Sequence, residues 1–539
     1  MTEPPRSNRN VDALPRYQPG RSAEAAIAEH GLASAIKLAS NESPFGPLPG
    51  VADAVAAAAA RANRYADHTA DAVARAYAAR VGVDRACVAV GPGSVGLLEQ
   101  LALAYLAPGS EVVYPWPSFI AYPQFTQLAG ATAVTVPLLR HRCDADAVVD
   151  AIGERTRMVL LANPNNPTST ALTGAELARI VDAAPDDCLV VLDEAYREFV
   201  TSPAVPDGIE SFAGNAKVAV LRSLSKAYGL AGLRIGMLVA DPAVVDAVNA
   251  CAIPFGVSAV AQSAALAAFE QDGEVARRCA AVTAERTRVA LLLRDRGIGT
   301  PASQGNFLWL PAGADGAALA AELDRRGVVI RLLPTGLRVT IGTREENDRF
   351  LEALDLVVGD DPERSPLLAD WGAATGGAAR NAGAWMQRLE HALVRLRDHL
   401  GRTHRGRTAP VPGETETWDA GQVWAHLAEF GDYWLAELAR VLDPGEAPTA
   451  QPVPFGRTRH DPHRIAAIDA GRHGDPARQL AAVEAAACRL EALLAGMSNA
   501  DWARRGLHET LGEMDVDAQL ERFHVGHYEE HADQLDSIA

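Results

Sequence analysis

Short apolar runs alternate with longer amphipathic stretches between about residues 36 and 240 of this 539-residue chain. The amphipathic stretches, such as Val95–Leu106 and Gly174–Ala184, predict helices. The apolar runs predict the strands Cys87–Val90, Glu111–Tyr114, Met158–Ala162, Cys188–Leu192, Val218–Leu221 and Ile235–Val239. This alternation predicts an α/β fold in which helices cover both faces of a mostly parallel sheet.

The pattern changes twice beyond this region. Residues 258–358 predict a smaller α+β unit that ends in a strand, LRVTIG, and a helix, EENDRFLEALDLVV. Residues 359–382 are rich in Gly, Pro and Ala and predict a linker. Four amphipathic stretches then predict an antiparallel, all-α bundle over residues 383–539, with helices at Ala384–Leu400, Ala420–Leu442, Pro476–Met497 and Asp515–Ile538. Within residues 1–358 we expect a large domain at about 36–257 and a small domain at about 10–35 plus 258–358.

Composition narrows the class of protein. With 48% hydrophobic and 22% charged residues, the chain is predicted to be soluble and globular. Its net charge of -18 argues against nucleic acid or an anionic membrane as a partner. No apolar run is long enough to cross a bilayer, and the N-terminus lacks the apolar core of a signal peptide. The six cysteines lie far apart without a CxxC pair, which predicts reduced thiols and a cytoplasmic location.

The segment RSLSKAYGLAGLRIG, residues 222–236, places phosphate-binding groups around one lysine. A lysine that forms a Schiff base with a phosphorylated aldehyde needs neighbours that hold the phosphate while the aldehyde carbon reacts. Ser223 and Ser225 offer hydroxyl groups, and Arg234 offers a forked, charge-assisted contact. The segment therefore indicates a pyridoxal-phosphate enzyme in which Lys226 carries the cofactor.

Three further residues suit the cofactor's ring. Asp193 ends the apolar run LVVLD, where α/β sheets place ligand groups, and its carboxylate would keep the pyridine nitrogen protonated. Tyr196 follows three residues later, and Asn166 lies in the turn-forming segment NPNNPTS. Both side chains are candidates to contact the ring hydroxyl oxygen.

A Gly-rich turn and an aromatic residue complete the predicted site. The stretch VAVGPGSVGLLEQ has the pattern strand, Gly-rich loop, helix, so the backbone N–H groups of Gly93, Ser94 and Val95 can bind phosphate at a helix N-terminus. Phe119, in WPSFIAY, is a candidate to stack on the ring. Each motif alone is weak, but all five occur in order along the chain and at the ends of predicted elements.

This ordered set resembles the fold type I pyridoxal-phosphate aminotransferases, in the branch of histidinol-phosphate and aromatic (phenylalanine) aminotransferases, over about residues 10–358. The motifs that carry the resemblance are LPRYQPGR, IKLASNESPFGPLP, NRYAD, VGPGSVGLLEQ, NPNNPTST, DEAY, SLSKAYGLAGLRIG, GNFLWLP and GLRVTIGTREENDRF. It implies that Lys226, Asp193 and Tyr196 are catalytic and that Arg338 binds the substrate α-carboxylate. It also implies a homodimer, because Tyr65 matches a tyrosine that reaches the phosphate of the neighbouring subunit.

The expected reaction is transamination of an aromatic, phenylalanine-like L-amino acid with 2-oxoglutarate as the acceptor. The sequence GSVG without acidic residues, WPSF, Ser169 after NPNNPT, and the short spacing between Arg331 and Arg338 resemble the aromatic branch. One alternative is a histidinol-phosphate aminotransferase, in which Arg331 and Tyr17 would contact a second phosphate. Another is a pyridoxal-phosphate decarboxylase acting on amino-acid phosphates. A regulator with an aminotransferase-like sensor would need a basic recognition helix, which this acidic chain does not show.

The predicted bundle carries a separate candidate site. His527 and His531, in ERFHVGHYEEHADQL, lie one helical turn apart, and His426 lies in VWAHLAEF. Three histidines from two facing helices would suit a divalent metal with open coordination positions. The segments TWDAGQVWAHLAEF and H-x3-H-x2-Q resemble the DinB-like, mycothiol-dependent isomerase and thiol-transferase family, which implies these three residues as ligands of zinc or nickel. Hydrogen-bonded core histidines, and a docking or dimer-supporting role for the bundle, remain alternatives.

Overall fold

The structure is a computed structural model that describes residues 20–358 and 377–538 apart from short gaps, together with Val11 and Leu14. The gaps are residues 140, 297, 313–315, 409–416, 443–451, 458–460, 496, 498 and 503. The chain divides into two compact units, with the main boundary near residue 360.

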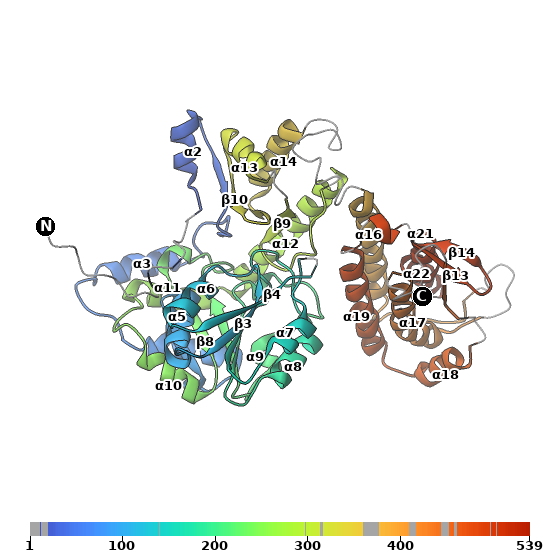
Figure 1. Cartoon of the computed structure of the whole chain (residues 1–539), viewed down its shortest axis with the longest axis horizontal. Helices are drawn as coiled ribbons and strands as arrows, with labels where there is room; N and C mark the ends of the chain where they lie inside the picture. Colours follow the sequence, from blue (N-terminus) through green and yellow to red (C-terminus); the bar gives the residue numbers. More distant parts are fainter. Residues whose placement is uncertain are drawn as a thin grey trace. The chain divides into compact units, whose positions relative to one another are not determined.

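A seven-stranded sheet forms the centre of the first unit (Figure 1). Its order is β2-β8-β7-β6-β5-β3-β4. The strands are β2 (Val88–Gly91), β3 (Glu111–Trp116), β4 (Thr132–Pro137), β5 (Thr156–Ala162), β6 (Leu189–Asp193), β7 (Val218–Ser223) and β8 (Gly236–Val239). Only β8 is antiparallel to its neighbours, so the prediction of a mostly parallel sheet is confirmed. Strand β4 was not predicted, because it is an edge strand that buries only Val136 and lacks a continuous apolar run.

Helices lie on both sides of this sheet, as predicted (Figure 1). Residues of α5, α6 and α10 share one apolar core cluster with residues of the central strands. The helices of this part are α3 (Val51–Ala59), α4 (Asp71–Val81), α5 (Gly93–Tyr105), α6 (Ala121–Leu128), α7 (Ala145–Ala151), α8 (Gly174–Ala183), α9 (Gly208–Ser211), α10 (Pro242–Ala250) and α11 (Ala259–Phe269).

A second, four-stranded sheet of the first unit has the order β1-β10-β11-β9. Its strands are β1 (Ile36–Leu38), β9 (Phe307–Pro311), β10 (Val328–Leu333) and β11 (Gly336–Thr340). The accompanying helices are α2 (Ala23–His30), α12 (Asp272–Asp295) as far as Ala290, α13 (Gly316–Arg325) and α14 (Arg344–Val358). Strand β1 pairs with β10, so the residues at 36–38 contribute to this smaller sheet rather than to the large one.

The second unit is mainly helical, as predicted. Its helices are α16 (Gly377–Asp398), α17 (Ala420–Leu442), α18 (Pro462–Gly471), α19 (Pro476–Ala495), α20 (Asn499–Trp502), α21 (Val516–Phe523) and α22 (Val525–Ser537). The last predicted helix is broken in two, because His524 leaves the helical conformation with φ -138° and ψ -97°.

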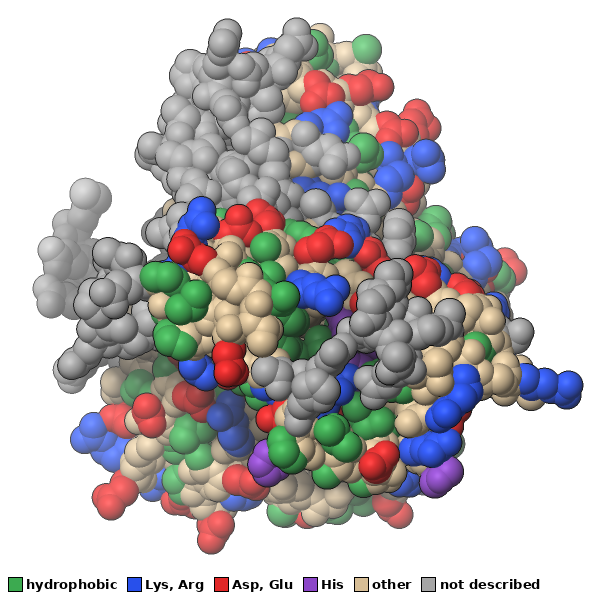
Figure 2. All heavy atoms as spheres, turned by 90° about the vertical axis from the view of Figure 1, so that its right-hand side faces the viewer, with side chains coloured by type: hydrophobic (Ala, Val, Ile, Leu, Met, Phe, Trp, Pro, Cys, Tyr) green, Lys and Arg blue, Asp and Glu red, His purple; other side chains and the backbone are tan. Residues whose placement is uncertain are grey.

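The structure adds to this unit a small sheet that the sequence did not predict. It consists of β12 (Val453–Phe455), β13 (Arg505–His508) and β14 (Gly512–Asp515). These strands are three or four residues long and lack an alternating apolar pattern, so nothing in the sequence marks them. Acidic and basic side chains are interspersed over the described surface of the face shown in Figure 2.

Candidate active site and candidate metal centre

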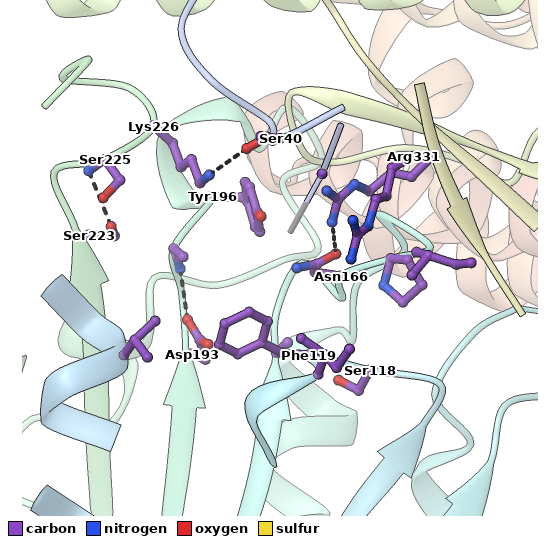
Figure 3. Close-up of a pocket in the computed structure, with 18 of the residues that line it drawn as sticks. Ser40, Ser118, Phe119, Asn166, Asp193, Tyr196, Ser223, Ser225, Lys226 and Arg331 are labelled. Atoms are coloured by element: carbon purple, nitrogen blue, oxygen red, sulfur yellow. Dashed lines mark hydrogen bonds between the residues drawn. The ribbon is translucent and has the colours of Figure 1, made fainter. Parts of the chain in front are cut away.

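A cavity of about 430 Å³ in the first unit brings most of the predicted cofactor and substrate residues together (Figure 3). Its walls come from the carboxyl ends of β6 and β7, from the start of α5, and from β10 and β11. The predicted residues that line it are Ser94, Val95, Phe119, Asn166, Asp193, Tyr196, Ser223, Ser225, Lys226, Arg234, Arg331 and Arg338.

Lys226 enters this cavity with its amine Nζ donating a hydrogen bond to the carbonyl oxygen of Ser40, 3.0 Å away (Figure 3). Burial, followed by the positive charge of Arg338, lowers the pKa of Lys226 from 10.5 to about 7. A substantial share of the amine is therefore neutral at pH 7. This is the form that attacks an aldehyde and that accepts a proton.

Asp193 is buried at the end of β6. Burial raises the pKa of Asp193 to about 6, although hydrogen bonds from the Ala195 N–H and the Tyr122 hydroxyl favour the charged form. A cation at the cofactor's ring nitrogen would stabilise the carboxylate and lower its pKa. The carboxylate therefore fits the pyridine nitrogen of pyridoxal phosphate. Sequence reasoning missed Tyr122, although it is the last residue of the segment WPSFIAY that drew attention to Phe119.

The N-terminus of α5 and Arg234 form a cationic corner of the cavity. Gly93 has φ +78°, and a Cβ atom there would lie 2.4 Å from Nη2 of Arg234. A Cβ at Gly236 would lie 2.5 Å from the backbone nitrogen of Ser94. Glycine at both positions thus lets α5 approach Arg234 and β8. Gly93 does not line the cavity, but its lack of a side chain shapes this corner, which suits a phosphate group.

Two arginines lie opposite each other on the paired strands β10 and β11. Arg331 and Arg338 are direct Cα partners, so their side chains leave the sheet on the same face. Nη1 of Arg338 donates to Oδ1 of Asn166 at 2.5 Å, and Nη2 donates to the carbonyl oxygen of Ala39 at 2.8 Å. A fixed guanidinium in a buried cavity is suited to bind a carboxylate through two parallel hydrogen bonds.

One predicted residue of the first unit that the structure describes, Tyr65, stands apart from the residues that line this cavity. Tyr65 is 84% exposed, and its ring stacks on Phe255 with the ring centroids 4.5 Å apart. Tyr17 lies outside the described residues.

Three histidines meet inside the second unit. His426 comes from α17, and His527 and His531 come from α22. Nε2 of His527 lies 2.9 Å from Nε2 of His426 and 2.9 Å from Nε2 of His531. His426 and His531 are buried, whereas His527 is partly exposed. The predicted cluster is therefore assembled, with its three Nε2 atoms facing a common point.

The other ring nitrogens of these histidines face acceptors three residues further along the same helices. Nδ1 of His531 donates to Oε1 of Gln534 at 2.8 Å, while Glu429 and Glu530 have a carboxylate oxygen 3.8 Å from Nδ1 of His426 and His527. Burial lowers the pKa of His531 to about 4 and holds the pKa values of the other two histidines well below 6.5. The Gln534 oxygen assigns the proton of His531 to Nδ1 and leaves its Nε2 lone pair for the cluster, and neutral rings whose Nε2 atoms converge would be stabilised by a divalent cation.

Comparisons with known proteins relate each of the two units to a family. Residues 33–354 match the family aminotransferase class I and II, and residues 382–535 match the DinB superfamily. The chain belongs to the aminotransferase class I and II family.

Relatives and solved structures support this assignment. The aromatic amino acid aminotransferase of Thermobifida fusca is 47% identical over 350 residues, which cover 65% of this chain and 96% of that protein. The aromatic amino acid aminotransferase of Rhodococcus jostii is 49% identical over 349 residues, covering 64% of this chain and 94% of that protein. The crystal structure of histidinol-phosphate aminotransferase from Sinorhizobium meliloti in complex with pyridoxal 5'-phosphate is 30% identical, with a TM-score of 0.62 over 66% of this chain and 99% of that one.

This aminotransferase is thus a pyridoxal-phosphate-dependent enzyme with a DinB-like C-terminal unit, as predicted. The match of 350 residues covers 96% of the Thermobifida protein, so that relative has no part as large as the second unit. Among the residues that the structure describes, every helix is too short or too polar to span a bilayer.

Proposed function

We propose that the enzyme transaminates aromatic L-amino acids, with 2-oxoglutarate as the acceptor. The observation that carries this proposal is that relatives 44–49% identical over nearly their whole length are named aromatic amino acid aminotransferases. The cavity suits an aromatic substrate, because the apolar side chains of Trp116, Phe119, Ile120 and Leu333 line it together with Arg331 and Arg338. An apolar side chain and a carboxylate can therefore be bound at the same time.

Pyridoxal phosphate, when bound, supplies an electron sink for the bond that breaks at the substrate α-carbon. Lys226 would hold its aldehyde carbon, Asp193 its ring nitrogen, and Asn166 and Tyr196 its ring oxygen. Phe119 would face the ring. The phosphate would lie among Gly93, Ser94, Val95, Ser223, Ser225 and Arg234.

Arg338 and Lys226 then act on different parts of the substrate. Arg338 binds the α-carboxylate, which orients the α-hydrogen towards the lysine. Nζ of Lys226 accepts this proton as a general base and returns it as a general acid, and a pKa near 7 suits both directions. The apolar walls exclude water around this proton transfer.

Histidinol phosphate is the second candidate substrate, because Arg331 faces the same cavity as Arg338. Its guanidinium would bind the substrate's phosphate, with Tyr17 as the other predicted contact. The 30% identical Sinorhizobium enzyme supports this candidate less strongly than the more similar aromatic aminotransferases support the first.

The proposed assembly is a homodimer in the cytoplasm, in which Tyr65 contacts the phosphate bound by the other subunit. Tyr65 and Phe255 form an exposed aromatic pair, and Ile253 beside them is 68% exposed. Apolar surface of this kind is typical of subunit interfaces. All six cysteines lie in the described part of the chain and are thiols, which fits a reducing compartment.

For the second unit we propose a divalent metal, zinc or nickel, bound by Nε2 of His426, His527 and His531. Support comes from the three converging Nε2 atoms and from the Gln534 oxygen that holds Nδ1 of His531. Three protein ligands leave a tetrahedral ion one open position.

A half-reaction titration tests the proposed substrate. Phenylalanine and histidinol phosphate are added separately to the holoenzyme without any keto acid, and the absorbance band of the lysine-bound cofactor is followed. Phenylalanine is expected to abolish the band. Loss of the band with histidinol phosphate alone would instead establish the second candidate.

A further inference from the structure

Three consecutive residues after β1 contact three different side chains of the proposed active site. The carbonyl oxygen of Ala39 accepts from Arg338, and that of Ser40 accepts from Lys226. Nδ2 of Asn41 then donates to the hydroxyl oxygen of Tyr196 at 3.0 Å. Ala39 and Ser40 make these contacts through backbone carbonyl oxygens, which any residue type provides. Asn41 uses its side chain, so only its contact depends on the residue type.

The amide of Asn41 is fully buried and held in one orientation. The Thr340 hydroxyl donates to Oδ1 of Asn41 at 3.1 Å and accepts the Asn41 backbone N–H at 2.9 Å. Nδ2 of Asn306 donates to the Asn41 carbonyl oxygen at 3.2 Å. With Oδ1 occupied by Thr340, the NH₂ group must face Tyr196. The backbone of Asn41 has φ +52°, a conformation that asparagine adopts more readily than most residues.

This orientation determines where the proton of Tyr196 points. The Tyr196 oxygen accepts from Asn41, so its own hydrogen is not used in that bond and remains available to the cavity that Tyr196 lines. The ring itself is held by an edge-to-face contact with Phe307, at 5.0 Å between centroids.

We propose that Asn41 is a positioning residue whose side-chain amide holds the Tyr196 hydroxyl as a hydrogen-bond donor to the ring oxygen of the cofactor. This inference rests on the proposed contact between Tyr196 and pyridoxal phosphate. A donor at that oxygen stabilises its negative charge and so weakens the basicity of the neighbouring cofactor–lysine nitrogen. Without Asn41, Tyr196 is a weaker and less well-oriented donor.

The test is a pH titration of the absorbance band of the lysine-bound cofactor in the holoenzyme, without substrate. Asn41→Gly removes the amide, and glycine tolerates the positive φ without strain. We expect the band's pKa to rise by about 0.5–1 unit, the usual net value of one hydrogen bond. Tyr196→Phe is expected to raise it by more, because the donor itself is lost.

The double variant N41G/Y196F separates positioning from a general structural effect. If Asn41 acts through Tyr196, the double variant has the same band pKa as Y196F. Asn306→Ala is the matched control, because Asn306 contacts the Asn41 backbone but not Tyr196. Its band pKa is expected to equal that of the unaltered enzyme.

Two results would overturn the inference and can be told apart. The first is a band pKa that moves in Y196F but not in N41G, or that N41G shifts equally in the unaltered enzyme and in Y196F. Either form of this result would show that Asn41 does not act through Tyr196, and would leave the Tyr196 contact intact. An unchanged band pKa in Y196F would remove the Tyr196 contact itself and the inference with it. Neither outcome bears on which amino acid is the substrate, since none is added.

Discussion

The two candidate sites bury polar groups in opposite ways. The cavity of the first unit combines an amine, carboxylates, three guanidiniums and a phenol, and strands of both sheets of that unit contribute to it. Burial moves the pKa of Lys226 down and that of Asp193 up, to about 7 and about 6. The second unit instead gathers three identical imidazoles from two helices. Acidic and basic groups side by side in the first site can donate and accept protons, as a reaction requires. The three imidazoles of the second site offer identical nitrogen lone pairs, which suit only the binding of a cation.

Replacing the central group of the first site should have the largest effect. Lys226→Ala removes the covalent anchor and the proton-transfer group together, so the transamination rate should fall by at least about 1,000-fold. Stopped-flow absorbance with phenylalanine measures it. Lys217→Ala should retain the rate, because the Lys217 amine donates to the Ala184 carbonyl oxygen and does not line the cavity. A K226A enzyme of near-normal rate would contradict the mechanism.

Substitutions at the histidine cluster of the second unit should have the next largest effect, on the affinity for zinc. His531→Ala removes one of the three proposed ligands and should abolish high-affinity zinc binding. Gln534→Ala should weaken it by about 10–100-fold through loss of the Nδ1 acceptor. Calorimetric titration of the metal-free protein and the visible spectrum of its cobalt form report both changes. Equal affinities in all three proteins would show that the histidines are only core residues. Removing the metal with a chelator should leave the phenylalanine half-reaction unchanged.

The two arginines of the first site should differ from each other. Arg338→Ala should lower kcat/KM for phenylalanine by roughly 10–100-fold, because it leaves the α-carboxylate without its charged hydrogen bonds. Arg331→Ala should change the phenylalanine half-reaction less, since that substrate has only one carboxylate. The reverse order would exchange the roles of these residues.

The pH dependence of the first site should follow Lys226. The neutral Lys226 amine is the form that reacts with the cofactor's aldehyde, and the pKa of Lys226 is lowered to about 7. The rate at which the apoenzyme binds pyridoxal phosphate covalently should therefore rise with pH around pH 7 rather than around pH 10. In Arg338→Leu, which removes a repelling cation, the midpoint should move to higher pH. An unshifted midpoint in that variant would show that burial alone sets the pKa.

Deleting the second unit should have the smallest effect on transamination. A relative 47% identical to this chain has no part of that size, so residues 1–358 should retain phenylalanine activity within about threefold, well under 1 kcal/mol of barrier. Steady-state assays of the shortened and full chains measure this. A collapse of activity with intact folding would show that the second unit supports the first.

Local pattern explains which elements could be predicted. The strands β5, β6 and β7 are buried along nearly their whole length, so each appears in the sequence as a continuous apolar run. Strand β4 is mostly exposed, and the break at His524 is marked in the sequence by one glycine, Gly526, at which a Cβ would collide with the Glu521 carbonyl oxygen. Edge strands and helix breaks depend on what packs against them, which no window of sequence contains.

The order of the motifs in the sequence determined the cofactor, the reaction class and the residues that meet in the cavity. Parallel strands bring their carboxyl ends to one edge, so residues such as Asp193 and Ser223 must converge once the strands are recognised. Only the tertiary structure decided the partners of these groups: Asn41 on Tyr196, Tyr122 on Asp193, and the common point of three Nε2 atoms. Hydrogen bonds and lone pairs depend on distances of a few tenths of an ångström between residues far apart in the chain, and folding alone sets those distances.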